Sequence, residues 1–220
     1  MPNAILFDFN GVIVNDEPQH CAALIETLAE YGHTLDRDTY YRDYLGFDDR
    51  ECFRYTFAQI GLPTDDGSIA EAIERKAAHY ERSIRASMRL VPGAPEFVRA
   101  AAAGGHRLAI VSGALRREID LVLGQAGLRD HFDTIVAAED VSACKPDPEG
   151  YERAVAALGI ARERCIVIED SRPGLDAARA AGLRCAMLAT SHDAASLTDA
   201  DLVWDDLAGR VPADLPWSDG

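Results

Sequence analysis

From Val91 to Trp204, short apolar runs alternate with segments in which apolar residues recur at helical spacing. The runs are rich in Ile, Val and Leu, which is typical of strands buried inside a sheet. Alternation at this pitch predicts β–α–β units around a parallel sheet. The expected strands are 108–111, 134–136, 165–168, 185–188 and 202–204, and the expected helices are 94–103, 115–126, 148–158 and 174–181. We therefore predict an α/β fold with a Rossmann-like parallel sheet.

One more strand is expected at residues 4–9, a largely apolar run that stops at Asn10-Gly11. Between this strand and the alternating part, the sequence shows only helical periodicity bounded by Gly, Pro or Asp. Those helical segments are residues 21–31, 48–60 and 69–84. We expect two domains, an α/β catalytic core of residues 1–15 and 88–220 and an inserted helical cap of residues 16–87.

The charge of the chain limits its partners. Its 220 residues include 22 Lys and Arg against 37 Asp and Glu, a formal net charge of −15. A surface this acidic repels phosphate backbones and anionic lipids, so we expect no nucleic-acid partner and no membrane partner. It also repels a small phosphorylated substrate, so a site for one needs local positive charge or a metal.

The cysteines and the apolar runs indicate the compartment. Five cysteines are scattered without a CxxC pair, which favours reduced thiols in a cytoplasmic protein. The N-terminus lacks the basic start and apolar stretch of a signal peptide, and charged residues interrupt every apolar run. We expect a cytoplasmic protein, and a monomer because each apolar stripe already has a place in a core.

Polar side chains follow several of the expected strands. Asp8 lies at the end of the first strand, Ser112 follows 108–111, and Glu169-Asp170 follow 165–168, while Lys145 lies in the loop after 134–136. Ligands of parallel sheets bind just beyond the carboxyl ends of the strands. Three neighbouring carboxylates repel one another unless a cation lies among them, and oxygen ligands suit Mg²⁺.

These residues are suited to phosphoryl chemistry. Ser112, with the backbone amide of Gly113, can hold a phosphoryl oxygen, and Lys145 supplies positive charge. Asp8 is then placed to attack phosphorus and form an aspartyl-phosphate. Taken singly, an Asp or Ser at a strand end is a common turn former, and a loop lysine is often a solvated charge. The occurrence of all four positions in this order at the sheet edge favours a functional site; they are Asp8, Ser112, Lys145 and Glu169-Asp170.

The motifs resemble those of the haloacid-dehalogenase-like (HAD) hydrolase superfamily. The resemblance covers nearly the whole chain and is closest to the phosphatase and phosphomutase branch, which carries a helical cap after the first strand. The motifs concerned are Asp8–Val14, Val111–Gly113, Lys145–Pro148 and Ile168–Ser171 followed by Gly174, Ala178, Ala181 and Gly182.

The resemblance implies a role for each residue of the motifs. It makes Asp8 the nucleophile, and it makes Ser112 and Lys145 the residues that bind the phosphoryl group. Mg²⁺ would be held by Asp8, the backbone carbonyl of residue 10 and Asp170, with Glu169 supporting or joining them.

One residue departs from the family pattern. Phosphatases of the family carry a second aspartate two residues after the nucleophile as general acid and base, and this chain has Asn10. An amide cannot transfer that proton, a loss worth about 10²–10⁴ in rate. Four explanations stay open: Asp16 or Glu17 substitutes, the substrate has a good leaving group, the protein is a slow enzyme or a phosphate-binding pseudoenzyme, or an Asp→Asn change was made to trap a complex.

The candidate substrate-binding residues come from both predicted domains. They are Gly11, Ser112, Gly113 and Lys145 at the sheet edge, with Glu17, His20, Arg50 and Lys76 from the cap. For Arg50 and Lys76 the simpler interpretation is a solvated charge beside acidic neighbours on a helix.

The leading hypothesis is a Mg²⁺-dependent HAD-type phosphatase that acts on a small phosphorylated metabolite. Its alternatives are a sugar-phosphate mutase and a slow or inactive phosphate-binding protein. A haloacid dehalogenase is disfavoured because the Glu169-Asp170 pair is present and residue 10 is not aromatic.

Overall fold

The structure of the chain is a computed structural model, and it describes residues 3–44, 47–191, 197 and 199–217. The chain divides into two compact units, one formed by Met1–Asn15 with Arg89–Gly220 and the other by Asp16–Met88. Each unit is described by itself below.

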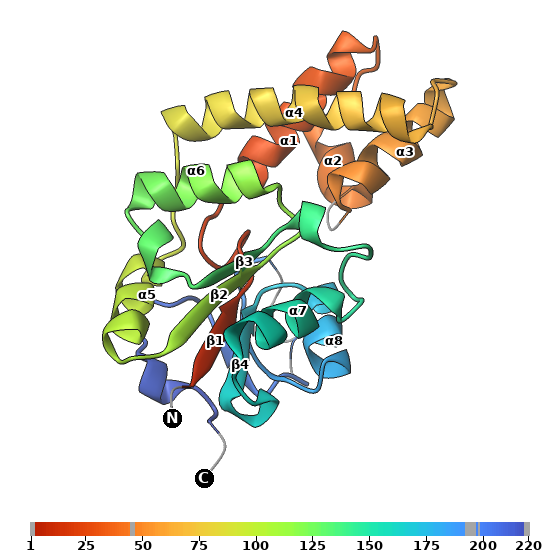
Figure 1. The fold of residues 1–220 in the computed structure, drawn as a ribbon. Helices are drawn as coiled ribbons and strands as arrows, with labels where there is room; N and C mark the ends of the chain where they lie inside the picture. Colours follow the sequence, from red (N-terminus) through yellow and green to blue (C-terminus); the bar gives the residue numbers. More distant parts are fainter. Residues whose placement is uncertain (1–2, 45–46, 192–196, 198, 218–220) are drawn as a thin grey trace. The chain divides into compact units, whose positions relative to one another are not determined.

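The first unit is built on a six-stranded sheet in the order β3-β2-β1-β4-β5-β6, and all neighbouring strands run parallel (Figure 1). The strands are β1 Ala4–Phe7, β2 Arg107–Val111, β3 Thr134–Val136, β4 Cys165–Glu169, β5 Arg184–Leu188 and β6 Leu202–Trp204. Because β1 lies in the middle, Leu6 pairs with Ala109 of β2 on one side and Val167 of β4 on the other. The predicted parallel α/β fold is confirmed.

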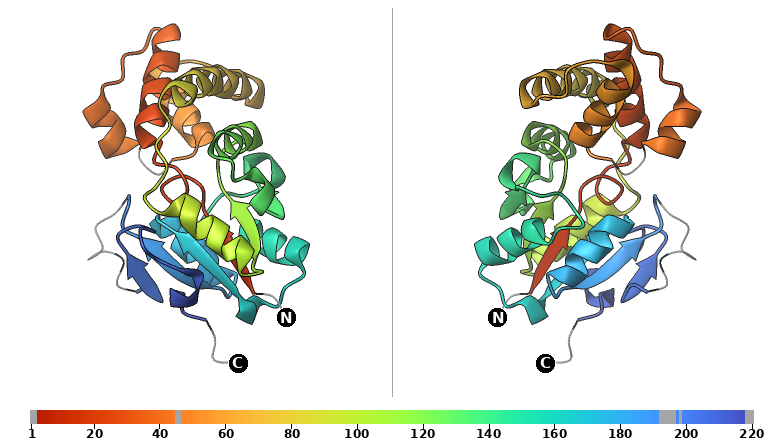
Figure 2. Two further views of the ribbon diagram at one scale, coloured as in Figure 1. Left: turned by 90° about the vertical axis from the view of Figure 1, so that its left-hand side faces the viewer. Right: turned by 90° about the vertical axis from the view of Figure 1, so that its right-hand side faces the viewer.

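Helices follow the strands as the sequence predicts. They are α5 Ala94–Ala103, α6 Arg116–Ala126, α7 Glu149–Leu158 and α8 Arg172–Ala180, with short 3₁₀ turns η1 Arg129–His131, η2 Ala138–Asp140, η3 Arg162–Arg164 and η5 Pro212–Asp214. Figures 1 and 2 show helices against both faces of the sheet. All four α-helices lie within two residues of their expected bounds, because turn residues flank each apolar stripe.

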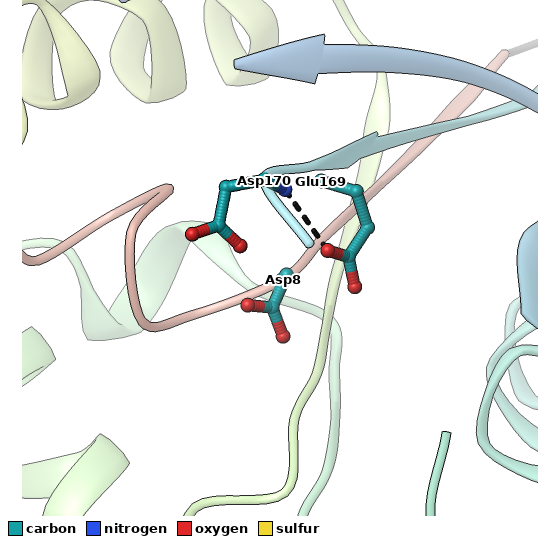
Figure 3. A group of neighbouring side chains, drawn as sticks. All are labelled: Asp8, Glu169 and Asp170. Atoms are coloured by element: carbon teal, nitrogen blue, oxygen red, sulfur yellow. Dashed lines mark hydrogen bonds between the residues drawn. The ribbon is translucent and has the colours of Figure 1, made fainter. Parts of the chain in front are cut away.

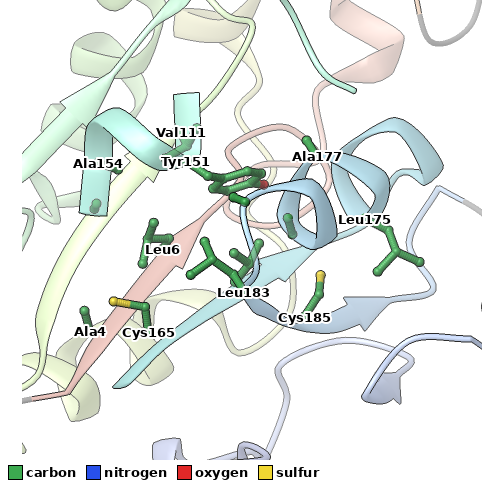
Figure 4. Close-up of a cluster of buried hydrophobic side chains, with 14 of the residues drawn as sticks. Ala4, Leu6, Val111, Tyr151, Ala154, Cys165, Leu175, Ala177, Leu183 and Cys185 are labelled. Carbon is green, nitrogen blue, oxygen red and sulfur yellow. The ribbon is translucent and has the colours of Figure 1, made fainter. Parts of the chain in front are cut away.

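The two faces of β1 bury different cores, because successive strand residues point to opposite sides. Leu6 packs in a cluster with Tyr151 of α7 and Leu175 of α8 (Figure 4). Phe7 points to the other face, where its ring lies 6.2 Å from Phe97 of α5. Each such side chain, when fully buried, contributes about 1.5–3 kcal/mol. The sheet is therefore a firm support for the loops at its carboxyl edge.

The second unit is all helical, with α1 Glu17–Glu30, α2 Arg37–Asp43, α3 Asp49–Ile60 and α4 Asp66–Ala86. Acidic residues cap three of these helices; Asp48 and Glu51, for example, form a capping box at α3. The sequence pattern missed α2, because its seven residues are mostly polar and only Tyr40 among them is buried. Within the described ranges, the helices lack the combination of length and apolar character needed to cross a membrane.

The chain leaves and re-enters the first unit at one place. Val14 and Leu90 form an antiparallel bridge, and the backbone N–H of Asn15 donates to the carbonyl of Arg89 at 2.8 Å. The N–H of Val91 donates to the carbonyl of Ile13 at 3.0 Å. The two connecting segments are therefore hydrogen-bonded to each other.

Candidate active site

Asp8 lies at the carboxyl end of the central strand. Its backbone N–H donates to the carbonyl of Ile168 in β4 at 2.9 Å, which continues the sheet pairing by one residue. A tight turn follows, in which Gly11 has a φ of 72°. A Cβ on Gly11 would lie 1.9 Å from Oδ2 of Asp170, so the turn needs glycine both for its conformation and for space.

Three carboxylates meet at this edge. One oxygen from each of Asp8, Glu169 and Asp170 lies within 4.8 Å of the others, and all three residues are buried (Figure 3). Asp8 comes from the end of β1, while Glu169 and Asp170 come from the end of β4. The adjacent parallel strands β1 and β4 thus deliver the three carboxylates to one edge of the sheet.

Lys145 joins this cluster from the loop before α7. Its Nζ donates to Oδ1 of Asp8 at 2.5 Å, to Oε1 of Glu169 at 2.6 Å and to the carbonyl of Val111 at 3.0 Å. An ammonium group has three N–H donors, so these three acceptors account for all of them. The lysine is thereby aimed at Asp8.

Ser112 and Asn10 lie beside each other at the same edge. The Ser112 hydroxyl is 3.5 Å from Oδ1 of Asn10 and accepts the backbone N–H of Ala114 at 3.0 Å. Gly113 has open space where a Cβ would be, so its backbone is accessible. The structure therefore brings together the sheet-edge residues selected from the sequence, which are Asp8, Asn10, Gly11, Ser112, Gly113, Lys145, Glu169 and Asp170.

Burial and mutual repulsion set the charges of the cluster. Burial raises the pKa of Asp8 to about 7, against the lowering effect of Lys145, and the charge of Glu169 adds to the rise. Burial, with the charges of Glu169 and Asp8, also raises the pKa of Asp170 well above its usual range. Near neutral pH, without a cation, Asp170 therefore tends to retain a proton, while Asp8 is partly ionised.

The Glu169 carboxylate and the Lys145 ammonium stay charged. Burial alone would raise the pKa of Glu169, but the Lys145 ammonium and the hydrogen bonds to the carboxylate lower it overall. Burial alone would lower the pKa of Lys145, but the charges of Asp8 and Glu169 raise it overall. Lys145 and Glu169 form the fixed ion pair of the site.

Glu169 is held against the first turn of α8. Its Oε2 accepts the backbone N–H groups of Asp170 at 2.9 Å and Ser171 at 3.0 Å, and the Ser171 hydroxyl at 3.0 Å. The N-terminus of a helix favours a negative charge at this place. A Cβ on Gly174 would lie 1.8 Å from Oε1 of Glu169, so only glycine leaves room for the carboxylate.

Gly174→Ala should therefore lower the free energy of unfolding by about 1–3 kcal/mol, because the added methyl group displaces a buried carboxylate. Urea unfolding measures the loss. The matched control is Gly124→Ala in α6, where a Cβ meets nothing within 4 Å. Alanine there should raise the free energy of unfolding by about 0.5–1 kcal/mol. An equal gain in both variants would contradict the close packing of Glu169 on α8.

Sequence reasoning missed three residues at this edge. Thr190 donates its hydroxyl to the carbonyl of Gly11 at 2.6 Å, and the Ser191 hydroxyl donates to Oδ2 of Asp170. Tyr151 of α7 donates its hydroxyl to Oε1 of Glu169 at 2.9 Å. Thr190 and Ser191 follow an expected strand, so the rule that selected Asp8 and Ser112 could also have found them.

The candidate residues in the helical unit all have partners within that unit. The Tyr40 hydroxyl donates to Glu17 at 2.5 Å, and Arg50 is exposed with its Nη1 3.6 Å from Asp66. The interpretation of Lys76 as a solvated charge is wrong. Lys76 is 3% exposed because it lies on the buried side of α4. The assignment of these residues to substrate stays a prediction.

The partners of the buried lysine include residues of two other helices of the unit. Lys76 forms an ion pair with Asp49 of α3, and its Nζ is 2.9 Å from Nδ1 of His20. The His20 ring stacks on Tyr80 with the ring centres 4.4 Å apart.

The fold and this edge define a Rossmann-like α/β protein with a buried cluster of three carboxylates and one lysine. The family model of the haloacid dehalogenase-like hydrolases matches residues 5–188 of the sequence. The chain therefore belongs to that family of hydrolases. The predicted family is confirmed, and with it the prediction of a hydrolase.

Curated relatives match over most of their length. Validoxylamine A 7'-phosphate phosphatase of Streptomyces hygroscopicus subsp. limoneus is 31% identical over 207 residues, which is 94% of this chain and 95% of the relative. Protein CbbY of Rhodobacter capsulatus is 32% identical over 202 residues, 86% of each chain.

Solved structures agree with this relationship. CbbY from Rhodobacter sphaeroides in complex with phosphate superposes with a TM-score of 0.86 at 28% identity, covering 97% of this chain and 98% of that one. A mutant of the same protein, in complex with xylulose-(1,5)bisphosphate, superposes with the same TM-score.

Proposed function

We propose that the chain is a Mg²⁺-dependent phosphatase that removes a phosphoryl group from a small phosphorylated metabolite. The proposal rests on the Asp8 carboxylate. It is buried at a strand end, accepts a hydrogen bond from Lys145 and lies next to two further carboxylates. Relatives named for phosphatase activity on phosphorylated carbohydrates and hexitols make phosphorylated sugars and polyols the first substrates to test.

Asp8 acts as the nucleophile in this proposal. Its carboxylate attacks phosphorus in line, a P–O bond forms, and the bond from phosphorus to the leaving oxygen of the substrate breaks. Lys145, the Ser112 hydroxyl and the Gly113 N–H stabilise the charge on the transferring group. Water then attacks phosphorus, which releases phosphate and restores Asp8. The proton donor to the leaving oxygen is open, because Asn10 cannot supply a proton.

The donor set of the site fits Mg²⁺. Three carboxylates share one buried space, and Asp8 and Asp170 have raised pKa values that a cation would reverse. We propose Asp8, Asp170 and the backbone carbonyl of Asn10 as the ligands, with Glu169 supporting them. When bound, the cation neutralises charge on the carboxylates and on the phosphoryl group.

Mg²⁺ affinity should depend on pH, because a proton and the cation compete for Asp8. With the pKa of that carboxyl at about 7, the apparent dissociation constant should rise about tenfold when the pH falls from about 8 to about 6. Protonation of Asp170 would steepen the change. Titration calorimetry with Mg²⁺ at several pH values measures it, and a constant affinity across this range would contradict Asp8 as a ligand.

Phosphate release from a panel of sugar, polyol and acyl phosphates, with and without Mg²⁺, tests the function. Release that requires Mg²⁺ supports the phosphatase. Binding without release would favour the phosphate-binding protein. This alternative is considered because Asn10 cannot act as the general acid and base. Conversion of one sugar phosphate to its isomer without phosphate release, followed by ³¹P NMR, would favour the mutase.

We also propose that the protein is cytoplasmic and monomeric and has no nucleic-acid or membrane partner. The net charge of −15 supports the last two statements. None of the five cysteines forms a disulfide and four of them are buried, which supports a reducing compartment.

A further inference from the structure

We propose that Tyr151 is a positioning residue that keeps Lys145 directed at Asp8, through its hydroxyl on Glu169 and its ring beside the lysine. The inference rests on the proposed role of Asp8 and Lys145 in phosphoryl transfer.

The Tyr151 hydroxyl and Lys145 share one oxygen. Tyr151 is 1% exposed, and its hydroxyl donates to Oε1 of Glu169 at 2.9 Å, while Lys145 donates to the same oxygen at 2.6 Å. The other oxygen of Glu169 already accepts three hydrogen bonds from Asp170 and Ser171. With both oxygens held, the carboxylate cannot turn, and Oε1 is a fixed point for the lysine.

Tyr151 also contacts the lysine directly. The Lys145 Nζ lies 5.2 Å from the centre of the Tyr151 ring, within the range of cation–π attraction. Tyr151 lies in the first turn of α7, and that turn is packed tightly. A Cβ on Gly150 would lie 2.9 Å from Cγ1 of Val111, the residue whose carbonyl also accepts from Lys145. One helical turn thus supports the lysine from two sides.

Loss of the hydroxyl would change the balance between the two acceptors of the lysine. Oε1 of Glu169 would then have one donor instead of two, so its unshared charge would attract the ammonium more strongly. The ammonium would move toward Glu169 and away from Asp8. Because Lys145 binds the phosphoryl group and also stabilises the charge that develops on it in the transition state, the loss should be larger in kcat than in KM.

The first test is Tyr151→Phe, which keeps the ring and removes only the hydroxyl. We expect kcat for phosphate release to fall about tenfold, since small displacements of a catalytic group have large effects on rate. KM and the Mg²⁺ affinity from calorimetry should change less than kcat does, because the lysine contributes most where charge develops in the transition state.

The matched control is Tyr44→Phe in the helical unit. Tyr44 is buried, and its hydroxyl lies 2.9 Å from Oγ1 of Thr56. This variant should lose a similar free energy of unfolding with kcat unchanged. Equal losses of kcat in both variants would reduce Tyr151 to a structural role and overturn the inference.

The second test observes the lysine itself. The chain contains only two lysines, Lys76 and Lys145, so ¹⁵N-lysine labelling gives two side-chain ammonium signals. Tyr151→Phe should shift the signal of Lys145 and leave that of Lys76 unchanged, and Lys145→Arg assigns the pair. An unshifted Lys145 signal overturns the inference whatever the activity. A shifted signal in a protein that releases no phosphate supports the positioning and refutes the phosphatase instead.

Discussion

Asp8→Asn should abolish phosphate release, with a loss of at least about 10⁴-fold in kcat. The amide is not a nucleophile, so no aspartyl-phosphate can form at this position. Colorimetric phosphate assay in the presence of Mg²⁺ measures the loss. Intact-mass spectrometry of the quenched reaction should show a phosphorylated species in the parent protein and none in the variant.

Loss of activity in this variant should not come from unfolding. Folding raises the pKa of Asp8 to about 7, and a carboxyl with a raised pKa destabilises the fold as the pH rises above its ordinary value. Without Mg²⁺, Asp8→Asn should therefore be as stable as the parent or more stable at slightly alkaline pH. The control Asp130→Asn, at an exposed position in η1, should keep full activity. Undiminished release by Asp8→Asn would exclude Asp8 as the nucleophile.

Asn10→Asp should raise kcat by about 10²–10⁴, the usual contribution of a general acid–base group. The residue lies at the sheet edge, with its side chain 3.5 Å from the Ser112 hydroxyl. Its backbone carbonyl is the same in both proteins, so the gain should appear with the metal affinity changed little. Steady-state kinetics on a sugar phosphate and on an acyl phosphate measure it, and the gain should be smaller for the acyl phosphate because its leaving group needs less protonation.

The control for this gain is Asn15→Asp, which adds the same charge to an exposed residue nearby in the sequence and should leave kcat unchanged. A parent already as fast as Asn10→Asp would show that another group supplies the proton.

Asp16 and Glu17 were the sequence candidates for this group, and both form hydrogen bonds within the helical unit. Asp16 accepts the Tyr80 hydroxyl, and Glu17 accepts the Tyr40 hydroxyl.

The strands and the sheet-edge residues could be predicted from the sequence because both follow from local rules. A buried parallel strand is a short apolar run, and its carboxyl end is where ligands bind. Asp8, Ser112 and Glu169 each follow such a run directly, so their meeting required no knowledge of side-chain packing.

Other features could not be predicted because they depend on packing between distant segments. The simpler interpretation of Lys76 from the sequence is a solvated charge on a helix, whereas in the structure it is buried in contact with Asp49 of α3 and His20 of α1. The sequence analysis did not select Tyr151 of α7, whose hydroxyl donates to Glu169 of β4, a residue on a different element. In both cases the partner lies on another element.

The bridge between Val14 and Leu90 holds the two ends of the helical insert together within the first unit. Because the two connecting segments are already paired in the first unit, a short loop from Asn15 to Arg89 could replace the whole insert with little loop-closure entropy. Chimaeras that exchange residues 16–88 between relatives would therefore test the prediction that residues of the helical unit bind substrate, because Asp8 stays in the first unit.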